Sequence, residues 1–386
     1  MLALLKLMGK KIKLIHIITH LPVGGAQDNT LYTLELLDKK KYEIYLCCNL
    51  KGELVNRAKG IKKIKLINVP YLQREINLFN DIYAFIKIFK IIKKGSFDIV
   101  HTHSSKAGFI GRIAAKLYDV PLVIHTVHGF PFNDFMFYIK KHFFIYIEKL
   151  LSKWTDALIT VSNLNKQKII DLKISKESKI HNIYSGIDLN LFEDKKDISF
   201  RKKINISSEK ILIGSVGRLS HQKDPLTMID AFKIISDRFP NAHLVLIGDG
   251  ILMEAIVKRL NELNLNEKVH LTGNISSPWE VYQSLDLFIM SSIYEGLGRS
   301  ITEAMCCGVP VVCTAVEGVP EIVKDGITGL LVMPKDFEGL AKSIIECLEN
   351  MEDAKKRACE GQKFVNDNFS VIKMVEDIDN LYSELI

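Results

Sequence analysis

Short apolar runs alternate with longer amphipathic segments along most of this chain of 386 residues. Continuous apolar strands that alternate with helices are typical of a parallel sheet covered on both faces. The expected strands of the first series span 13–19, 43–48, 64–69, 98–101, 122–127, 157–161 and 179–184. Those of the second series span 211–216, 243–247, 269–271, 285–290, 309–313 and 330–332. The pattern predicts an α/β fold of two doubly wound parallel-sheet, Rossmann-like domains that face a central cleft.

A charged segment at 193–197 separates the two series of expected strands. We therefore expect an N-terminal domain over residues 1–195 and a second domain over residues 196–368. The pattern at 371–385 is helical, and we treat residues 369–386 as a separate C-terminal helix.

The composition is ordinary for a soluble globular enzyme, with 47% apolar and 25% charged residues. No apolar run reaches the length of a transmembrane helix, and the apolar stretch within residues 1–11 is too short for a signal peptide. The seven cysteines have no zinc-binding or CxxC spacing, which favours reduced, buried thiols. We expect a cytoplasmic protein.

Charge is distributed unevenly between the two halves. Residues 1–200 contain 32 lysines and arginines against 18 acidic residues, whereas residues 201–386 contain 20 against 27. A basic half can meet nucleic acid, anionic lipid or a phosphorylated acceptor. Segment 130–154 alternates lysines with the aromatic residues Phe132, Phe135, Phe137, Phe143, Phe144 and Tyr146. That segment is compatible with peripheral contact at the inner face of an anionic membrane, or with a helix that covers the core.

The segment from Ser292 to Met305 carries the clearest chemical signal. It follows an apolar strand, contains the turn Gly296-Leu297-Gly298 and then opens a helix. A helix N-terminus after a glycine turn binds anions through free N–H groups and the helix dipole. Glu295 and Glu303 place two carboxylates around this turn, which suits a nucleotide-sugar with phosphates on the turn and hydroxyls on the acids.

Two cations follow the first strand of the second series, at Arg218 and Lys223. Open α/β sheets bind ligands at the carboxyl ends of their strands. Cations at that place stabilise the charge that grows on a leaving diphosphate more than they stabilise the ground state. The alternative is a solvated loop with ordinary basic residues.

The sequences of these two segments resemble motifs of glycosyltransferase family 4, whose members are retaining enzymes of the GT-B fold. Glu295 to Glu303 resembles the family's Glu-x7-Glu element, and Gly217 to Lys223 resembles its Gly-Arg-Leu-x3-Lys element. The resemblance implies that Arg218 and Lys223 hold the donor diphosphate. It also implies that Glu303 takes the ribose hydroxyls and that Glu295 contacts the sugar ring.

Other segments match the family less specifically. Gly25 lies in a loop that resembles the family's glycine loop, and Gly248 resembles a glycine beside the base and ribose; simple turns are the alternatives. His128 resembles the histidine that contacts the donor sugar near the reacting carbon. We expect His101, His103 and Lys106 on the acceptor side. The histidine spacing does not fit a metal site, and the acids of a metal triad are missing, so we expect no metal and no cofactor.

The resemblance implies a metal-independent, retaining hexosyltransferase. It would move a hexose or N-acetylhexosamine from a nucleotide-sugar, UDP-linked by family frequency, to a saccharide or polyprenyl-diphosphate-linked acceptor. The motifs are similar to those of the bacterial surface-polysaccharide subset of the family. We expect the C-terminal helix to cross back to the first domain, and we expect no nucleic-acid partner. A nucleotide-sugar epimerase of the same fold and an inactive partner subunit remain alternatives, and a dinucleotide oxidoreductase lacks its GxGxxG fingerprint.

Overall fold

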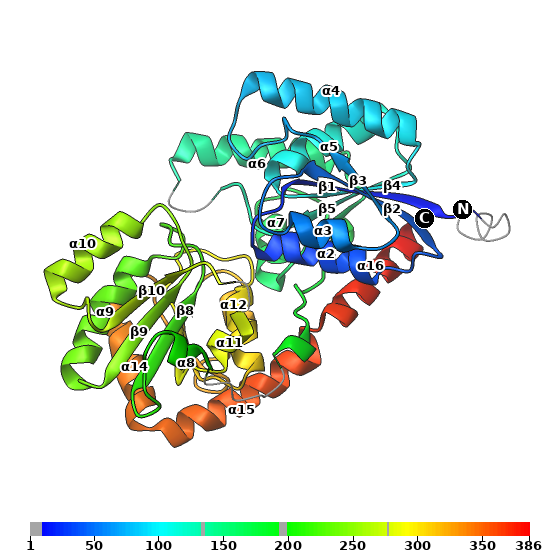
Figure 1. The fold of residues 1–386 in the computed structure, drawn as a ribbon. Coiled ribbons are helices and arrows are strands. Elements are labelled where there is room, and N and C mark those ends of the chain that lie inside the picture. The colour runs from blue at the N-terminus through cyan, green and yellow to red at the C-terminus, as the bar shows by residue number, and fades with distance from the viewer. Residues whose placement is uncertain (1–9, 133–135, 193–198, 276–277) are drawn as a thin grey trace. The chain divides into compact units, whose positions relative to one another are not determined.

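The computed structural model describes residues 10–132, 136–192, 199–275 and 278–386 (Figure 1). The chain divides into two compact units. The first unit comprises Met1–Gly186 with Val371–Ile386, and the second comprises Ile187–Ser370. The expected linker at 193–197, the first nine residues and Phe135 lie outside the described residues.

A seven-stranded parallel sheet in the order β3-β2-β1-β4-β5-β6-β7 forms the centre of the first unit. Its strands are β1 (Ile12–His20), β2 (Tyr42–Asn49), β3 (Ile64–Asn68), β4 (Ile99–His103), β5 (Leu122–Val127), β6 (Ala157–Thr160) and β7 (Ile180–Asn182). The helices are α2 (Gly25–Leu36), α3 (Val55–Gly60), α4 (Leu78–Gly95), α5 (Ser105–Leu117), α6 (Tyr138–Ser152), α7 (Asn163–Asp171) and α16 (Val371–Leu385), with the short 3₁₀ turn η1 (Glu177–Lys179). Because all the strands are parallel, their carboxyl ends lie at the same edge of the sheet, and helices connect each strand to the next.

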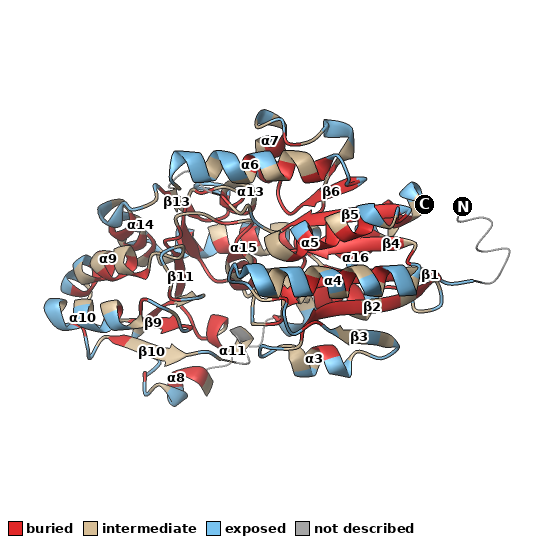
Figure 2. Cartoon of the chain, turned by 90° about the horizontal axis from the view of Figure 1, so that it is seen from above, coloured by how far each residue is buried: buried red, intermediate tan, exposed pale blue. Residues whose placement is uncertain are grey.

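Helices cover both faces of this sheet. Helices α4, α5 and α6 form one layer, and α2, α3 and α16 lie on the opposite face (Figures 1 and 2). Figure 2 shows the central strands buried between helices whose outer sides are exposed, whereas the edge strand β3 is partly exposed. This burial on both faces explains why the strands read as continuous apolar runs.

The second unit repeats the architecture with a six-stranded parallel sheet in the order β10-β9-β8-β11-β12-β13. Its strands are β8 (Ile211–Val216), β9 (Ala242–Ile247), β10 (Val269–Gly273), β11 (Leu287–Met290), β12 (Val311–Thr314) and β13 (Leu330–Val332). Its helices are α8 (Ser199–Lys203), α9 (Pro225–Arg238), α10 (Met253–Leu263), α11 (Pro278–Tyr282), α12 (Arg299–Cys306), α13 (Val319–Ile322), α14 (Phe337–Glu349) and α15 (Met351–Asn368), after the 3₁₀ turn η2 (Leu189–Leu191). All thirteen expected strands are present.

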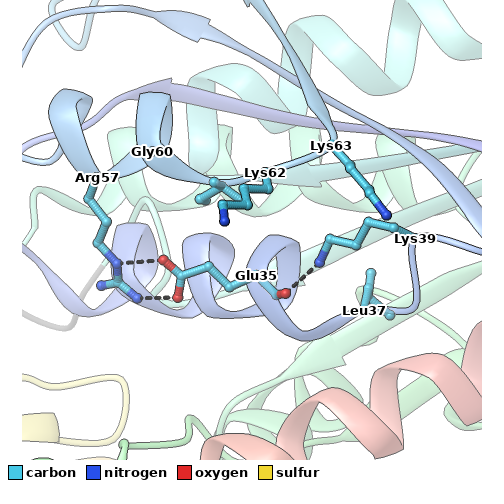
Figure 3. Close-up of a pocket in the computed structure, with 8 residues that line it drawn as sticks. Glu35, Leu37, Lys39, Arg57, Gly60, Lys62 and Lys63 are labelled. Atoms are coloured by element: carbon cyan, nitrogen blue, oxygen red, sulfur yellow. Dashed lines mark hydrogen bonds and ion pairs between the residues drawn. The ribbon is translucent and has the colours of Figure 1, made fainter.

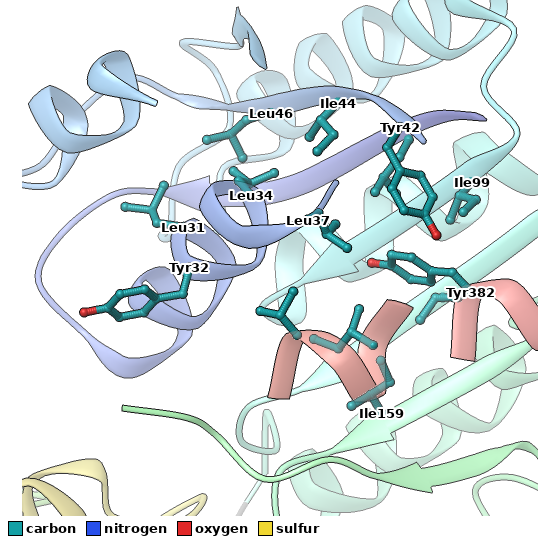
Figure 4. Close-up of a cluster of buried hydrophobic side chains, with 14 of the residues drawn as sticks. Leu31, Tyr32, Leu34, Leu37, Tyr42, Ile44, Leu46, Ile99, Ile159 and Tyr382 are labelled. Atoms are coloured by element: carbon teal, nitrogen blue, oxygen red, sulfur yellow. The ribbon is translucent and has the colours of Figure 1, made fainter. Parts of the chain in front are cut away.

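The C-terminal helix α16 belongs to the first unit, as the resemblance implied. It packs against α2 through a cluster that includes Leu34 of α2, Leu37 just after that helix, and Tyr382 of α16 (Figure 4). Asp379 of α16 accepts hydrogen bonds from Lys41 Nζ at 2.6 Å and from Tyr42 Oη at 2.5 Å. Each Å² of apolar surface removed from water contributes about 25 cal/mol to the free energy of unfolding. The apolar side chains that α16 buries therefore help to stabilise the core of the first unit.

The boundaries between the units differ from those expected. The second unit begins at Ile187 rather than at residue 196, and the returning segment begins at Val371 rather than at residue 369. Ile187 donates its backbone N–H to Phe369 O at 2.8 Å, which ties residues 187 and 369 to the same unit. A charged segment in the sequence does not reveal such a long-range pairing.

All seven cysteines are free, and burial raises the pKa of the Cys48 thiol to about 12. Within the described ranges, no helix is both long and apolar enough to cross a membrane.

Candidate active site

The carboxyl end of β11 leads into the segment with the two glutamates. The chain turns at Gly298, which has φ of 96°, and α12 begins at Arg299. A side chain at Gly298 would be strained by this φ, and its Cβ would lie 2.8 Å from Ile301 Cδ1. Glu303 is the fifth residue of α12.

Lys223 and Glu295 form an ion pair at this edge of the sheet. Lys223 Nζ donates a hydrogen bond to Glu295 Oε1, and Ser292 Oγ donates to the same oxygen at 2.9 Å. The Glu295 side chain is 9% exposed and that of Lys223 is 23% exposed. A carboxylate with so little water around it is stabilised by its cation, and the Lys223 side chain keeps partial contact with solvent.

Glu303 is held by two neighbours that the sequence analysis did not single out. Tyr282 Oη donates to Glu303 Oε2 at 2.8 Å, and Arg299 Nε lies 2.9 Å from Glu303 Oε1. Burial, together with the Glu303 carboxylate, raises the pKa of Tyr282 well above its usual value, so the phenol remains a donor. The spacing of Arg299 and Glu303, four residues apart on a helix, was a signal in the sequence. Tyr282 comes from α11, and no local pattern indicated it.

Arg218 is exposed on the loop after β8, and two glycines explain the path of that loop. A Cβ on Gly248, which has φ of 135°, would lie 2.0 Å from Gly217 O. A Cβ on Gly250 would lie 2.2 Å from Leu219 O. Gly248 and Gly250 are thus required for close packing against the loop that carries Arg218. The predicted contact of Gly248 with the donor stays a prediction.

The first unit places its expected residues at the carboxyl edge of its own sheet. Gly25 is the first residue of α2, and Lys106 lies in the first turn of α5. Lys106 Nζ pairs with Asp81 Oδ1 of α4 at 2.6 Å and also donates to the Glu75 carbonyl. An acceptor phosphate that uses Lys106 must therefore compete with Asp81.

His101 is completely buried in the first unit. Its Nδ1 lies 2.5 Å from Tyr382 Oη of α16, and its Nε2 lies 2.7 Å from Thr126 Oγ1. Both ring nitrogens are therefore used inside the fold. His101 is thus held inside the first unit, and its predicted role on the acceptor side stays a prediction.

His103 and His128 lie together with His16, a residue that the sequence analysis missed. The ring nitrogens of His16, His101 and His103 lie within 4.8 Å of one another, as in groups that can hold a metal ion. A metal ligand needs one free ring nitrogen, and His101 has both nitrogens hydrogen-bonded. In the sequence, His16 is marked by its place inside the continuous apolar run of β1.

A basic depression of about 710 Å³ lies elsewhere on the first unit, between the C-terminal ends of α2 and α3 (Figure 3). Lys39, Lys62 and Lys63 line it, and Arg57 pairs there with Glu35 at 2.8 Å. Gly25 begins α2 at the carboxyl edge of the sheet, whereas Lys39 follows the C-terminal end of α2, away from that edge. The depression is therefore not part of the candidate active site.

Comparison with known proteins identifies the family. The model described as Glycosyltransferase Family 4 matches residues 23–191, and the model described as Glycosyl transferases group 1 matches residues 196–364. The chain is 31% identical over 383 residues to the UDP-Gal:alpha-D-GlcNAc-diphosphoundecaprenol alpha-1,3-galactosyltransferase of Escherichia coli, covering 97% of this chain and 98% of the relative. The chain belongs to glycosyltransferase family 4. This family 4 glycosyltransferase is also 28% identical to the capsular polysaccharide biosynthesis glycosyltransferase CapM of Staphylococcus aureus, over 98% of both chains.

Solved structures share the fold of this glycosyltransferase. HepE of Anabaena, in complex with UDP and glucose, matches with a TM-score of 0.84 at 19% identity, over 97% of this chain and 100% of that one. Sucrose-phosphate synthase of Thermosynechococcus elongatus matches with a TM-score of 0.84 at 20% identity, over 97% and 99%. The predicted GT-B class, with two doubly wound domains, is confirmed.

Proposed function

We propose that this glycosyltransferase moves a hexose or N-acetylhexosamine from a UDP-sugar to a polyprenyl-diphosphate-linked saccharide, in the synthesis of a cell-surface polysaccharide. The observation that carries the proposal is the pairing of Lys223 with Glu295 beside the N-terminus of α12. The named activity of the Escherichia coli relative supports both the donor and the lipid-linked acceptor, since the similarity extends over almost the whole of both chains.

The residues of the second unit have separate roles in the proposed reaction. Lys223 and Arg218 neutralise the diphosphate, with the backbone amides at Gly296–Gly298 beside it. Glu303 accepts hydrogen bonds from the ribose hydroxyls, and Tyr282 holds that carboxylate in place. Glu295 contacts the sugar ring. Because Lys223 and Arg218 supply the positive charge, the proposed reaction is independent of metal.

The proposed transfer retains the anomeric configuration. The bond between the anomeric carbon and the diphosphate oxygen breaks, and a bond to the acceptor oxygen forms on the same face. The acceptor hydroxyl gives its proton to the leaving diphosphate, so no side chain becomes covalently attached to the sugar. Trapping of a glycosyl–enzyme adduct would contradict this part of the proposal.

A panel of nucleotide-sugars tests the donor and the role of metal. We expect release of UDP from one UDP-sugar, a rate that EDTA leaves unchanged, and an increase when a polyprenyl-diphosphate-linked saccharide is added. Release of UDP with an epimerised sugar and no acceptor would favour the epimerase alternative. Neither release nor binding of any donor would favour an inactive partner subunit.

The outer surface of the first unit supports peripheral contact with an anionic membrane. Phe137, just before α6, is 73% exposed, and Phe143 of α6 is 58% exposed, next to Lys140 and Lys141, whereas Phe132 is buried in the core. Around the start of α4, apolar side chains are also exposed, namely Ile76, Leu78, Phe79, Ile82 and Tyr83. The first turns of α4 and α6 lie in one helical layer and follow the carboxyl edge of the sheet (Figure 1). A lipid surface on this layer would present a lipid-linked acceptor at the edge that carries His128.

Vesicle flotation tests the membrane contact. The double substitution Phe137→Ser and Phe143→Ser is expected to weaken binding to anionic vesicles by about tenfold or more, because two exposed aromatic rings lose their contact with lipid. High salt should weaken the binding of the unmodified protein, since the lysines act through charge. The matched control is Ile251→Ser, which removes an apolar side chain of 79% exposure from the second unit. Equal flotation of all three proteins would contradict the proposed contact.

A further inference from the structure

Three histidines on neighbouring strands form a continuous hydrogen-bonded chain in the first unit. His16 lies on β1, His103 ends β4 and His128 follows β5, and these strands are adjacent in the sheet. His16 Nδ1 lies 2.9 Å from His103 Nε2, and His103 Nδ1 lies 3.1 Å from His128 Nε2. The rings are also stacked, with interplanar angles of 12° and 28°.

Each ring in the chain is neutral at physiological pH. Burial lowers the pKa of His16 to about 3 and that of His128 to about 4. Burial and the neighbouring histidines lower the pKa of His103 well below its usual value. A neutral imidazole has one N–H and one acceptor nitrogen. The position of the proton on one ring therefore determines its position on the next.

Only two proton arrangements satisfy both hydrogen bonds. In the first, His16 and His103 carry their protons on Nδ1, so His128 accepts at Nε2 and carries its own proton on Nδ1. In the second, all three protons are on Nε2, and Nδ1 of His128 is an acceptor. The two arrangements present opposite hydrogen-bonding characters to a substrate at His128 Nδ1.

The buried end of the chain distinguishes the two arrangements. His16 Nε2 is buried and has no hydrogen-bond partner among the described residues. In the second arrangement this nitrogen would be an unpaired N–H, whereas in the first it is an unpaired acceptor. Buried N–H groups without a partner are rarer than under-satisfied acceptors. The first arrangement is therefore favoured.

We infer that His16 and His103 are positioning residues that hold His128 in the Nδ1–H tautomer, so that His128 donates a hydrogen bond to an oxygen of the substrate. A donor at this place attracts a hydroxyl or phosphoryl oxygen, and a lone pair would repel a phosphoryl oxygen. The assignment of a substrate contact to His128 rests on the proposed function. The tautomer itself is a property of the free protein.

Ring ¹⁵N NMR of the full chain, labelled at histidine and free of ligand, tests the tautomer. The signals of His128 are assigned by their loss in His128→Gln. We expect a protonated Nδ1 and an unprotonated Nε2 at His128. The variant His103→Phe removes the donor to Nε2, so the proton of His128 should distribute over both nitrogens. His103→Asn keeps an amide donor near the former Nδ1 and should restore the Nδ1–H form. His125→Asn changes a buried histidine outside the chain and is the matched control.

A His128 that carries its proton on Nε2 in the unmodified protein would overturn the inference. So would a His128 that keeps Nδ1–H unchanged in His103→Phe. This measurement needs no substrate, so it stands even when the proposed function fails. Once an active donor is known, His103→Phe should lower kcat about tenfold with little change in KM, because a factor of ten corresponds to the loss of about one hydrogen bond. His103→Asn should recover most of the rate.

Discussion

Replacement of Lys223 by alanine is expected to lower kcat by at least about 100-fold while the protein remains folded. Lys223 is the cation beside Glu295 at the N-terminus of α12, and the charge on the leaving diphosphate grows as the glycosidic bond breaks. Loss of one such preorganised group typically removes about 3 kcal/mol of transition-state stabilisation. Steady-state kinetics with the preferred donor, together with thermal unfolding, measure both parts of this prediction.

Two further variants make the Lys223 result interpretable. Lys223→Ala leaves Glu295 as a buried carboxylate without its cation, so part of any loss can come from local destabilisation. Lys223→Ala combined with Glu295→Gln removes that charge and should be as inactive as the single variant. Lys233→Ala breaks an exposed ion pair with Asp237 on α9 and is the matched control. Turnover of Lys223→Ala within about threefold of the unmodified protein would exclude the assigned role of Lys223.

Acid is expected to unfold the first unit before the second. Six histidines of the first unit have their pKa lowered, mainly by burial, against two, His243 and His270, in the second unit; the six are His16, His101, His103, His125, His128 and His181. Their unfolded pKa is about 6.5, so between that pH and the folded pKa the unfolded state binds more protons. The free energy of unfolding is therefore undiminished above about pH 6.5 and falls as the pH decreases, by about 1.4 kcal/mol per pH unit for each such histidine. His16 alone, with a folded pKa of about 3, removes about 3 kcal/mol between pH 6 and pH 4.

The two tryptophans allow each unit to be followed separately. Trp154 belongs to the first unit and Trp279 to the second. Trp279→Phe leaves Trp154 as the reporter, and Trp154→Phe leaves Trp279. Denaturant unfolding of both variants from about pH 7 to pH 4 should show a steeper loss of stability in the first unit. His16→Asn, which removes one titrating ring, should reduce that slope by about one proton. Equal slopes in the two units would contradict the prediction.

The sequence predicted the strands well because the central strands are buried on both faces, and burial leaves a continuous apolar run. It also predicted the turn before α12 and the carboxylates on either side of it, because a glycine turn followed by a helix is a local pattern. The hydrogen-bond partners of the site residues could not be predicted from local sequence patterns. Tyr282 reaches Glu303 from another helix, and His16 reaches His103 across 87 residues. Such contacts depend on strand order, which local periodicity does not specify.

The unit boundaries show the same limit. A charged segment suggested a division near residue 195, whereas the pairing of Ile187 with the Phe369–Ser370 region places the division at Gly186. His101 was expected on the acceptor side, and the structure buries it completely. The helix α16, at the end of the chain, supplies Tyr382 as the hydrogen-bond partner of His101. Sequence reasoning had placed α16 on the first domain by resemblance alone.

Transfer of a radiolabelled sugar from a UDP-sugar to a polyprenyl-diphosphate-linked saccharide is the measurement that tests the proposed reaction. We expect that the label enters the lipid phase with the unmodified protein, that the new linkage has the anomeric configuration of the donor, and that Lys223→Ala abolishes the transfer. The proposed reaction would be contradicted if the label remained water-soluble, as free sugar or as an epimerised nucleotide-sugar, while UDP was still released.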